Sequence, residues 1–261
     1  MSTKKETFAT LIKQFEYRYD LREAFDDFLT MTICAFSRNP ETGLSFNEDI
    51  YLKTIAKYKE EETRKFFPKL LSHLVNEMEE RLDSSEGFDV LGEFYELNIS
   101  KNSKSQFFTP WPICQFMAKA TMDESRKTET DRPLRILDPA CGSGRMLLAA
   151  SRASNPYNEY YGVDIDHCCT KMTAINFFLG GLFKSEVMCA DALFPENFTL
   201  SYRISMLPFG IFKIEEKEKS PLWWLYNNSM KGEKKKEPEK PFDSWTEKGT
   251  SSDEGSQLKL F

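Results

Sequence analysis

A glycine-rich turn at residues 138–144, Asp-Pro-Ala-Cys-Gly-Ser-Gly, constrains the fold of this chain more than any other segment. A largely apolar run at 134–137 precedes the turn and a helix-like stretch at 145–153 follows it, so the local order is strand, turn and helix. Gly142 and Gly144 allow a tight bend and a close approach to a ligand that a Cβ would push away, and the next helix offers unpaired N–H groups. The segment therefore predicts a nucleotide-cofactor loop.

The residues after this turn argue against a dinucleotide cofactor. A dinucleotide-binding loop carries a third glycine, whereas residues 145–147 are Arg, Met and Leu. The next two predicted strands end in acids, Asp164 and Asp191. An acid at the end of the second strand can accept hydrogen bonds from both ribose hydroxyls. Asp166 is the competing candidate for that role, and we favour Asp164 because it directly follows the strand, whereas Asp166 can cap the next helix.

Taken in order, these motifs resemble those of the amino-methylating DNA methyltransferases, which bind S-adenosylmethionine. Residues 106–110, Gln-Phe-Phe-Thr-Pro, are similar to the family segment beside the methionine end of the cofactor, where an aromatic face suits the sulfonium cation. Residues 191–193, Asp-Ala-Leu, resemble the family's acidic loop at the adenine ring. The resemblance implies S-adenosylmethionine as the cofactor, bound by Phe107, Phe108, Thr109, Pro110, Asp138, Pro139, Ala140, Cys141, Gly142, Gly144, Asp164, Ile165, Asp191 and Ala192.

Within that family, residues 85–212 look most like the modification subunit of type I restriction systems. The stretch 89–96, Asp-Val-Leu-Gly-Glu-Phe-Tyr-Glu, carries this resemblance together with the Phe-Phe-Thr-Pro segment after it. The implied fold is α/β, a Rossmann-like S-adenosylmethionine-dependent methyltransferase sheet preceded by an all-α N-terminal bundle. The family sheet has further strands for which residues 213–261 leave no room, so we expect a truncated version.

Residues 206–210, Met-Leu-Pro-Phe-Gly, depart from the family pattern of Asn or Asp, two prolines and an aromatic residue. In the family the polar residue and the adjacent backbone carbonyl hold the target amino group, whereas a methionine thioether is a weak acceptor. Phe209 still suits stacking on a base flipped out of the duplex, although it can equally be a core residue. The resemblance thus places a degenerate catalytic motif at Met206, Leu207, Pro208 and Phe209.

Composition predicts a globular protein with tails, because 40% of the 261 residues are apolar and 22 are phenylalanine. The net charge of −6 gives no general attraction to phosphate, so DNA binding needs a local basic surface or a partner. We expect no metal site, because the six cysteines form no Cys-x-x-Cys pair and there are two histidines. The adjacent Cys168 and Cys169 are expected to be reduced thiols. No apolar run is long enough to span a membrane, and we expect a cytoplasmic protein.

Spacing and composition divide the chain into three predicted parts. Residues 1–100 show apolar residues at helical spacing and predict a helical N-terminal domain. Residues 101–212 alternate short strands with helices and predict the cofactor-binding domain, with a parallel sheet. Residues 213–261 predict a charged, largely disordered tail that contains a short aromatic helix at 221–226.

The last five residues resemble the short motif by which bacterial DNA enzymes attach to the replicative sliding clamp. Gln257, Leu258, Leu260 and Phe261 would make that contact.

The leading hypothesis from the sequence is an adenine-N6 DNA methyltransferase-like protein of restriction-modification type, which acts on DNA with a partner subunit. Because of the degenerate motif, whether the chain alone is an enzyme stays open. The alternative is a catalytically silent cofactor-binding or scaffold subunit that joins a methyltransferase or the clamp, and a third hypothesis is methylation of an amine or amide in protein or RNA.

Overall fold

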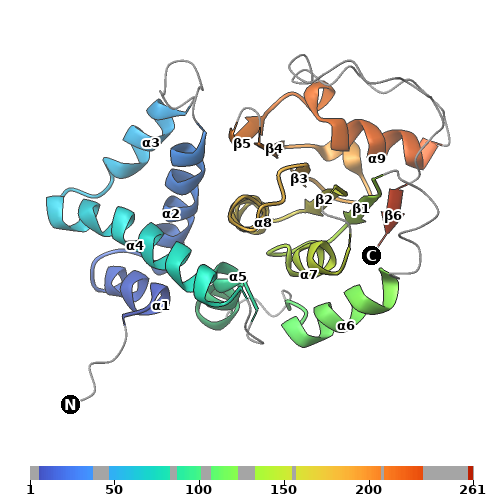
Figure 1. The fold of residues 1–261 in the computed structure, drawn as a ribbon. Coiled ribbons are helices and arrows are strands. Elements are labelled where there is room, and N and C mark those ends of the chain that lie inside the picture. Colours follow the sequence, from blue (N-terminus) through green and yellow to red (C-terminus); the bar gives the residue numbers. More distant parts are fainter. Residues whose placement is uncertain are drawn as a thin grey trace.

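The computed structural model describes residues 6–37, 47–82, 87–100, 107–122, 133–154, 157–206, 209–231 and 258–260. Helices occupy the N-terminal part and a mixed sheet with flanking helices occupies the rest (Figure 1). The expected fold class, a Rossmann-like α/β sheet preceded by a helical bundle, is confirmed at this level. None of the described helices combines the length and apolar character needed to cross a membrane.

The N-terminal helices form where the sequence spaces apolar residues at three and four. They are α1 (Phe8–Ile12), α2 (Leu21–Phe36), α3 (Glu48–Ile55), α4 (Glu61–Glu80) and α5 (Val90–Phe94), which continues as a π-helical turn at Tyr95–Ile99. The apolar stripe of α4 is buried at Phe67, Leu70, Leu74 and Met78. The buried rings of Phe15, Tyr58 and Phe67 contact one another inside the bundle. Packing of these stripes, rather than helix propensity alone, therefore holds the helices together.

The sheet has the strand order β5-β4-β3-β2-β1-β6. Its strands are β1 (Arg135–Asp138), β2 (Glu159–Asp164), β3 (Ser185–Cys189), β4 (Leu200–Met206), β5 (Phe209–Ile214) and β6 (Leu258–Leu260). β1, β2, β3 and β6 run parallel to one another, whereas β4 pairs antiparallel with β3 and β5 pairs antiparallel with β4.

The antiparallel hairpin corrects the expectation that the whole sheet is parallel. Residues 190–199, which join β3 to β4, hold only the short 3-10 turn Pro195–Asn197. A parallel return needs a crossover of about a dozen or more residues, usually with a helix in it. This connection is too short, so β4 has to run back beside β3 in the opposite direction.

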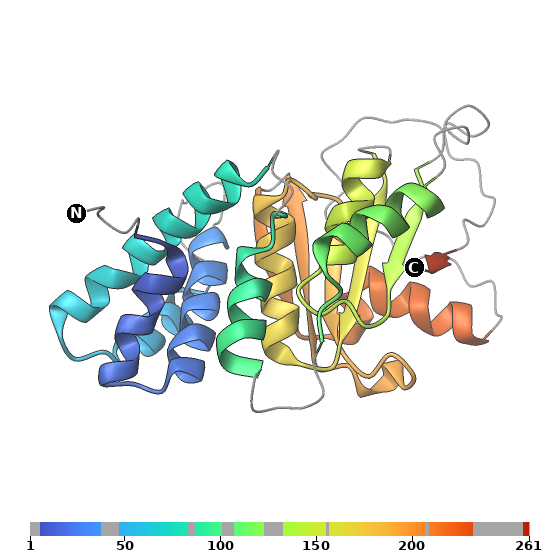
Figure 2. The same cartoon turned by 90° about the horizontal axis from the view of Figure 1, so that it is seen from below.

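Helices cover both faces of the sheet (Figures 1 and 2). One face packs against α7 (Arg145–Ala153) and α8 (His167–Leu179), and the opposite face packs against α9 (Pro221–Lys231). α6 (Trp111–Thr121) lies outside α7. The N-terminal helices lie beside α8, and one continuous hydrophobic core runs from them to the α8 side of the sheet. The helical part is therefore packed directly onto the element that follows the second strand.

Candidate functional site

The carboxyl ends of β1, β2 and β3 bring three of the predicted site residues to one edge of the sheet. Asp138 ends β1 and Asp164 ends β2, while Asp191 follows β3 by two residues. The register pairs Asp138 with Gly162 and Asp164 with Cys189, so the three acids lie at neighbouring strand ends. We call this the acidic edge. Ligands of α/β sheets bind at such edges, because the loops there are free to form a site.

The glycine turn after β1 lies directly against the acidic edge. Gly142 and Gly144 have φ of +56° and +84°, in the left-handed region that residues with a Cβ rarely adopt. The backbone N–H of Gly142 donates to Asp164 Oδ2 at 2.9 Å, and the N–H of Asp166 donates to Asp164 Oδ1 at 2.9 Å. Asp138 Oδ1 accepts from the N–H of Ala140 at 3.0 Å. The carboxylates at the first two strand ends therefore hold the turn in place.

The geometry separates the two candidates at the end of β2. Asp164 contacts the glycine turn, whereas Asp166 caps α8 by accepting hydrogen bonds from the N–H groups of Cys168 and Cys169. Tyr95 of the helical part also donates to Asp166, at 3.5 Å. Asp166 therefore caps α8, whereas the Asp164 carboxylate lies against the glycine turn.

The pKa values of two carboxyl groups at the acidic edge, those of Asp138 and Asp164, are raised. Burial raises the pKa of Asp138, a hydrogen bond from Ala140 counteracts it, and the nearby charge of Asp164 adds to the rise. Burial likewise raises the pKa of Asp164, partly offset by hydrogen bonds from the backbone N–H groups of Asp166 and Gly142. Hydroxyl donors or positive charge on a ligand would stabilise the ionised form of these two carboxylates.

Apolar side chains stand exposed next to these acids. Ile165, directly after Asp164, is 71% exposed, and Leu193, two residues after Asp191, is 74% exposed. Ala192, which lies between Asp191 and Leu193 in the sequence, is half-buried. Asp191 Oδ1 accepts a hydrogen bond from the N–H of Leu193 at 2.9 Å. A carboxylate beside an uncovered apolar surface suits a ribose joined to a flat heterocycle, because one binds the hydroxyls and the other the ring.

The Phe-Phe-Thr-Pro segment reaches the glycine turn through one of its two rings. The Phe108 ring packs over Gly142 so closely that a Cβ there would lie 2.9 Å from it. Phe108 also stacks on Tyr95 with 5.9 Å between ring centres, and the Arg145 guanidinium lies 5.4 Å from the ring. Phe107 is 86% exposed and contributes no such packing.

The remaining predicted residues lie around the turn in different environments. Pro110 precedes α6, and the Thr109 carbonyl accepts from Cys114 Sγ at 3.4 Å. Pro139 and Ala140 form the accessible start of the turn. Cys141 is buried, and burial raises the pKa of its thiol well above the usual range, so it stays protonated.

The strand pairing places Met206 and Phe209 of the degenerate motif away from the acidic edge. On β4, Leu200 pairs with Cys189 at the end of β3, whereas Ile204 pairs with Ser185 at its start. Met206 and Phe209 pair with each other two residues further on, at the amino ends of the parallel strands. Phe209 packs there against Phe178 and Phe183, with ring centres 4.8 Å and 5.4 Å apart. Leu207 and Pro208 lie outside the described residues.

Asp89, which is not among the predicted site residues, contacts the glycine turn from the helical part. It accepts hydrogen bonds from Ser143 Oγ and, at 2.5 Å, from Arg145 Nε. A cavity of about 450 Å³ opens beside this contact, lined by Gly87, Asp89, Glu93, Glu96, Leu97, Phe108, Pro110, Trp111, Pro112 and Arg145. The only signal in the sequence was the Asp-x-x-Gly spacing at a helix start, which predicts a cap but not its long-range partner. Within the described part of the chain, no cluster of three or more His, Cys, Asp or Glu is placed to hold a metal ion.

Comparison with known proteins gives matches over this part of the chain. Residues 86–237 match the family model described as N-6 DNA Methylase. The Type I restriction enzyme MjaVIII methylase subunit of Methanocaldococcus jannaschii is 31% identical over 139 residues, which are 49% of this chain and 23% of that protein. The chain thus spans about a quarter of the length of this relative.

Two solved structures are similar at low sequence identity. The type I restriction-modification methyltransferase subunit of Streptococcus thermophilus gives a TM-score of 0.34 at 16% identity, over 69% of this chain and 56% of that one. A protein of Listeria monocytogenes assigned to the class I S-adenosylmethionine-dependent methyltransferases gives 0.36 at 15% identity, over 69% and 51%.

Proposed function

Because the chain belongs to the N-6 DNA methylase family, we propose that it binds S-adenosylmethionine at the acidic edge and serves in the methylation of adenine N6 in DNA, as part of a restriction-modification system. S-adenosylmethionine is the cofactor of this family, and the curated relative is a type I methylase subunit. The observation that carries the proposal is the hydrogen bond from the Gly142 N–H to Asp164, because it joins the glycine turn and the acid into one site.

The residues of the acidic edge fit this cofactor. The Asp164 carboxylate accepts from backbone N–H groups through both of its oxygens and has a lone pair left for a ribose hydroxyl. The exposed Ile165 and the half-buried Ala192 offer apolar surface to an adenine ring. The Phe108 ring at Gly142 offers an aromatic face for the sulfonium. When bound, the cofactor supplies a methyl group on a positively charged sulfur.

Holding the target amine is the step for which the acidic edge offers least. Met206 and Phe209 lie at the amino end of the sheet, and a thioether is in any case a weak acceptor. In our proposal the acceptor groups come from a partner subunit, and the isolated chain binds cofactor but transfers methyl groups slowly or not at all. This placement favours, as the second candidate, a catalytically silent cofactor-binding or scaffold subunit that partners a complete methyltransferase.

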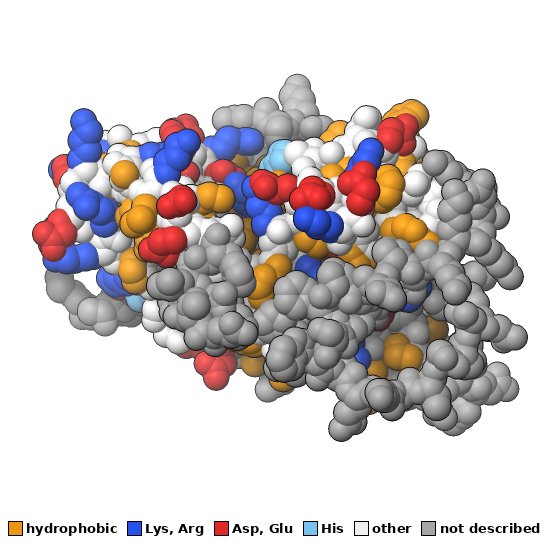
Figure 3. Space-filling model, turned by 90° about the horizontal axis from the view of Figure 1, so that it is seen from above, with side chains coloured by type: hydrophobic (Ala, Val, Ile, Leu, Met, Phe, Trp, Pro, Cys, Tyr) orange, Lys and Arg blue, Asp and Glu red, His pale blue; other side chains and the backbone are white. Residues whose placement is uncertain are grey.

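The surface charge supports a role for a partner in DNA binding. On the face drawn in Figure 3, basic side chains of the helical part are interspersed with acidic ones and form no single basic stripe among the described residues. The chain as a whole carries a charge of −6. In our proposal a partner subunit brings the basic surface that DNA binding needs.

The clamp contact stays a prediction. The structure places Leu258–Leu260 in β6, paired in parallel with β1, while Gln257 and Phe261 lie outside the described residues. A strand in the sheet is not free to enter a pocket on another protein, so clamp binding requires β6 to detach. The comparisons give the clamp contact no support.

Two measurements test the proposed function. Titration calorimetry with S-adenosylmethionine and the purified chain tests cofactor binding, and no heat of binding would end the proposal. Transfer of a labelled methyl group to unmethylated DNA, measured with and without candidate partner subunits, separates an active methyltransferase from a catalytically silent subunit. A silent subunit transfers no label itself. The same assay with protein and RNA substrates tests the third hypothesis.

A further inference from the structure

The Asp89 carboxylate connects the helical part to the glycine turn through a set of buried contacts. Asp89 is 4% exposed and lies at the start of α5. Its Oδ2 accepts from Ser143 Oγ, which lies between the two glycines of the turn, and from Arg145 Nε, the first residue of α7. Its Oδ1 accepts from Asn176 Nδ2 of α8 at 2.7 Å. One carboxylate therefore binds the turn and both helices that pack beneath it.

The local structure of α5 explains why this approach is possible. Asp89 caps α5 by accepting from the N–H of Gly92 at 2.8 Å, which fixes the direction of its side chain. A Cβ at Gly92 would lie 2.4 Å from Ser143 Oγ and 2.6 Å from Ser143 Cβ. The glycine thus lets the backbone of α5 lie against the turn, and the Asp-x-x-Gly spacing serves this contact as well as the cap.

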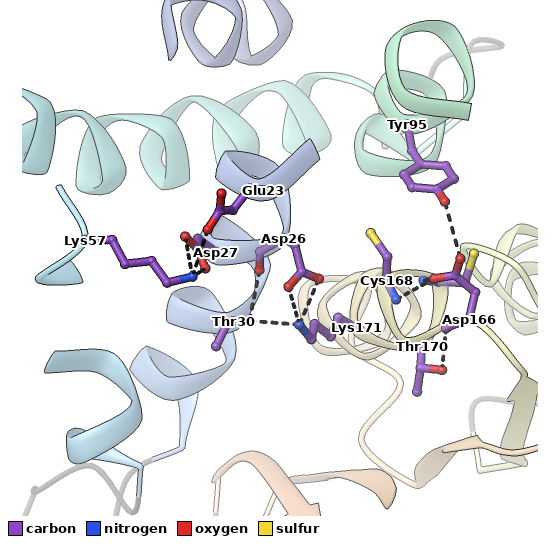
Figure 4. A network of polar contacts seen from close by, with 11 residues as sticks. Glu23, Asp26, Asp27, Thr30, Lys57, Tyr95, Asp166, Cys168, Thr170 and Lys171 are labelled. Carbon is purple, nitrogen blue, oxygen red and sulfur yellow. Dashed lines mark hydrogen bonds and ion pairs between the residues drawn. The ribbon is translucent and has the colours of Figure 1, made fainter. Parts of the chain in front are cut away.

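Other polar contacts between the helical part and α8 do not reach the turn (Figure 4). Lys171 of α8 binds the Asp26 carboxylate of α2 at 2.8 Å, and Tyr95 donates to Asp166 at the start of α8. These contacts fix the position of α8. Among the described ion pairs that join the helical part to the sheet part, those of Arg145, with Asp89 and at 3.3 Å with Glu96, lie next to the glycine turn.

We propose that Asp89 is a positioning residue for the cofactor loop: through Ser143 and Arg145 it sets the conformation in which the turn between Gly142 and Gly144 receives S-adenosylmethionine. The inference rests on the proposed function, because it assigns the cofactor to this turn. It also makes α5 a working part of the site, although α5 precedes the glycine turn by more than forty residues.

The physical basis is the cost of leaving charged and polar groups without partners in a buried place. Arg145 is 9% exposed, and its remaining contacts, to Glu96 at 3.3 Å and to the Thr109 carbonyl at 3.5 Å, are longer than its 2.5 Å bond to Asp89. Without the Asp89 charge, the Arg145 side chain and the Ser143 hydroxyl rearrange to form other hydrogen bonds. Because both residues belong to the turn and the first position of α7, this rearrangement changes the conformation of the turn. Small displacements of a binding loop reduce affinity strongly because each contact depends on alignment.

The test compares Asp89→Asn with Asp26→Asn. Both changes remove a carboxylate that pairs with a cation across the interface between the helical part and the sheet part, but only Asp89 contacts the turn. For Asp89→Asn we expect a dissociation constant for S-adenosylmethionine about 10 to 100 times that of the unmodified chain. Amide hydrogen exchange in a peptide spanning 139–146 should become about tenfold faster. Asp26→Asn should change neither by more than about twofold.

Asp89→Ser separates capping from positioning. Serine is a good N-cap, so α5 stays capped, but its short side chain cannot span to Ser143 and Arg145. We expect the serine variant to match Asp89→Asn in affinity and exchange, whereas a purely capping role predicts values close to the unmodified chain and would refute the inference. If the Asp89 variants do not fold, Ser143→Ala takes their place. It removes one contact and is expected to weaken binding about threefold to tenfold, and unchanged binding and exchange would then refute the inference.

The exchange measurement keeps this inference distinct from the proposed function. If the unmodified chain binds no S-adenosylmethionine, the proposed function fails, but faster exchange at 139–146 in Asp89→Asn alone still shows that Asp89 positions the turn. If the chain binds the cofactor and Asp89→Asn equals Asp26→Asn in both readouts, the positioning role is wrong and the proposed function stands.

Discussion

The carboxylate of Asp164 accepts a hydrogen bond from the backbone N–H of Gly142 at 2.9 Å, so the end of the second strand is bonded directly to the glycine turn after the first. This bond means that the acid has two roles at once. It stabilises a turn whose glycines have positive φ, and it keeps lone pairs available at an accessible edge. Substitutions at this position should therefore affect cofactor binding more than those at its neighbours.

Asp164→Asn should raise the dissociation constant for S-adenosylmethionine about tenfold or more, which corresponds to about 1.4 kcal/mol. The amide keeps one oxygen acceptor but replaces the other by a donor, which faces either a backbone N–H or the ligand's hydroxyls. Titration calorimetry measures the change. Asp166→Ser is the matched control, because serine still caps α8 and the residue does not contact the turn. An equal loss of affinity in both variants would contradict the assignment of the binding role to Asp164.

The two phenylalanines of the Phe-Phe-Thr-Pro segment should differ in their effect on stability. Phe108→Ala should lower the free energy of unfolding by about 1 to 3 kcal/mol, because its ring packs on Gly142, Tyr95 and Arg145. Phe107→Ala should change it by about 0.5 kcal/mol or less, since this ring is 86% exposed. Urea denaturation measures both values. Equal destabilisation by the two variants would show that the ring over the turn is not the one seen in the structure.

Glu186 provides a pH-dependent contribution to stability. It is buried on β3 and accepts from Ser201 Oγ at 2.7 Å, from Ser220 Oγ and from the N–H of Leu222 at the start of α9. Burial raises the pKa of Glu186, while these hydrogen bonds and the charge of Arg203 oppose the rise. Because the pKa is higher in the folded state, the associated stability is fully present below the unfolded pKa and is lost as pH rises through the folded pKa.

Glu186→Gln should remove that loss, because glutamine does not ionise. Relative to the unmodified chain, the variant should gain stability as the pH increases, by about 1 kcal/mol or more between about pH 4 and pH 7. Urea denaturation at the two pH values measures the difference. A variant that loses stability relative to the unmodified chain on going to the higher pH would show that Glu186 is stabilising as an anion.

Local signals in the sequence predict the glycine turn and the strand-end acids that form the acidic edge. Two glycines after an apolar run indicate the turn. The hydrophobic pattern locates the strands, and this shows which acids lie at the strand ends. The residues of β4 do not show in which direction the strand runs. Only the shortness of the connection 190–199 indicates that β4 is antiparallel to β3. The contact between Asp89 and Ser143 joins residues far apart in the chain. The local sequence at 89–96 therefore indicates that Asp89 caps a helix, but it does not indicate that Asp89 contacts Ser143.

Met206→Asn restores the residue type that the family carries at this position, but it should not create methyl transfer by the isolated chain. Met206 pairs with Phe209 in a hairpin at the amino ends of the parallel strands, whereas the acidic edge lies at their carboxyl ends. An amide placed at the wrong end of the sheet cannot orient an amine toward a methyl group bound near Gly142. Transfer of a labelled methyl group to unmethylated DNA measures the outcome, with Ser205→Asn, on the same strand, as the control for adding an amide nearby. Activity in Met206→Asn alone would require β4 to lie beside β1 instead of β3, and it would overturn the strand order on which the placement of the site depends.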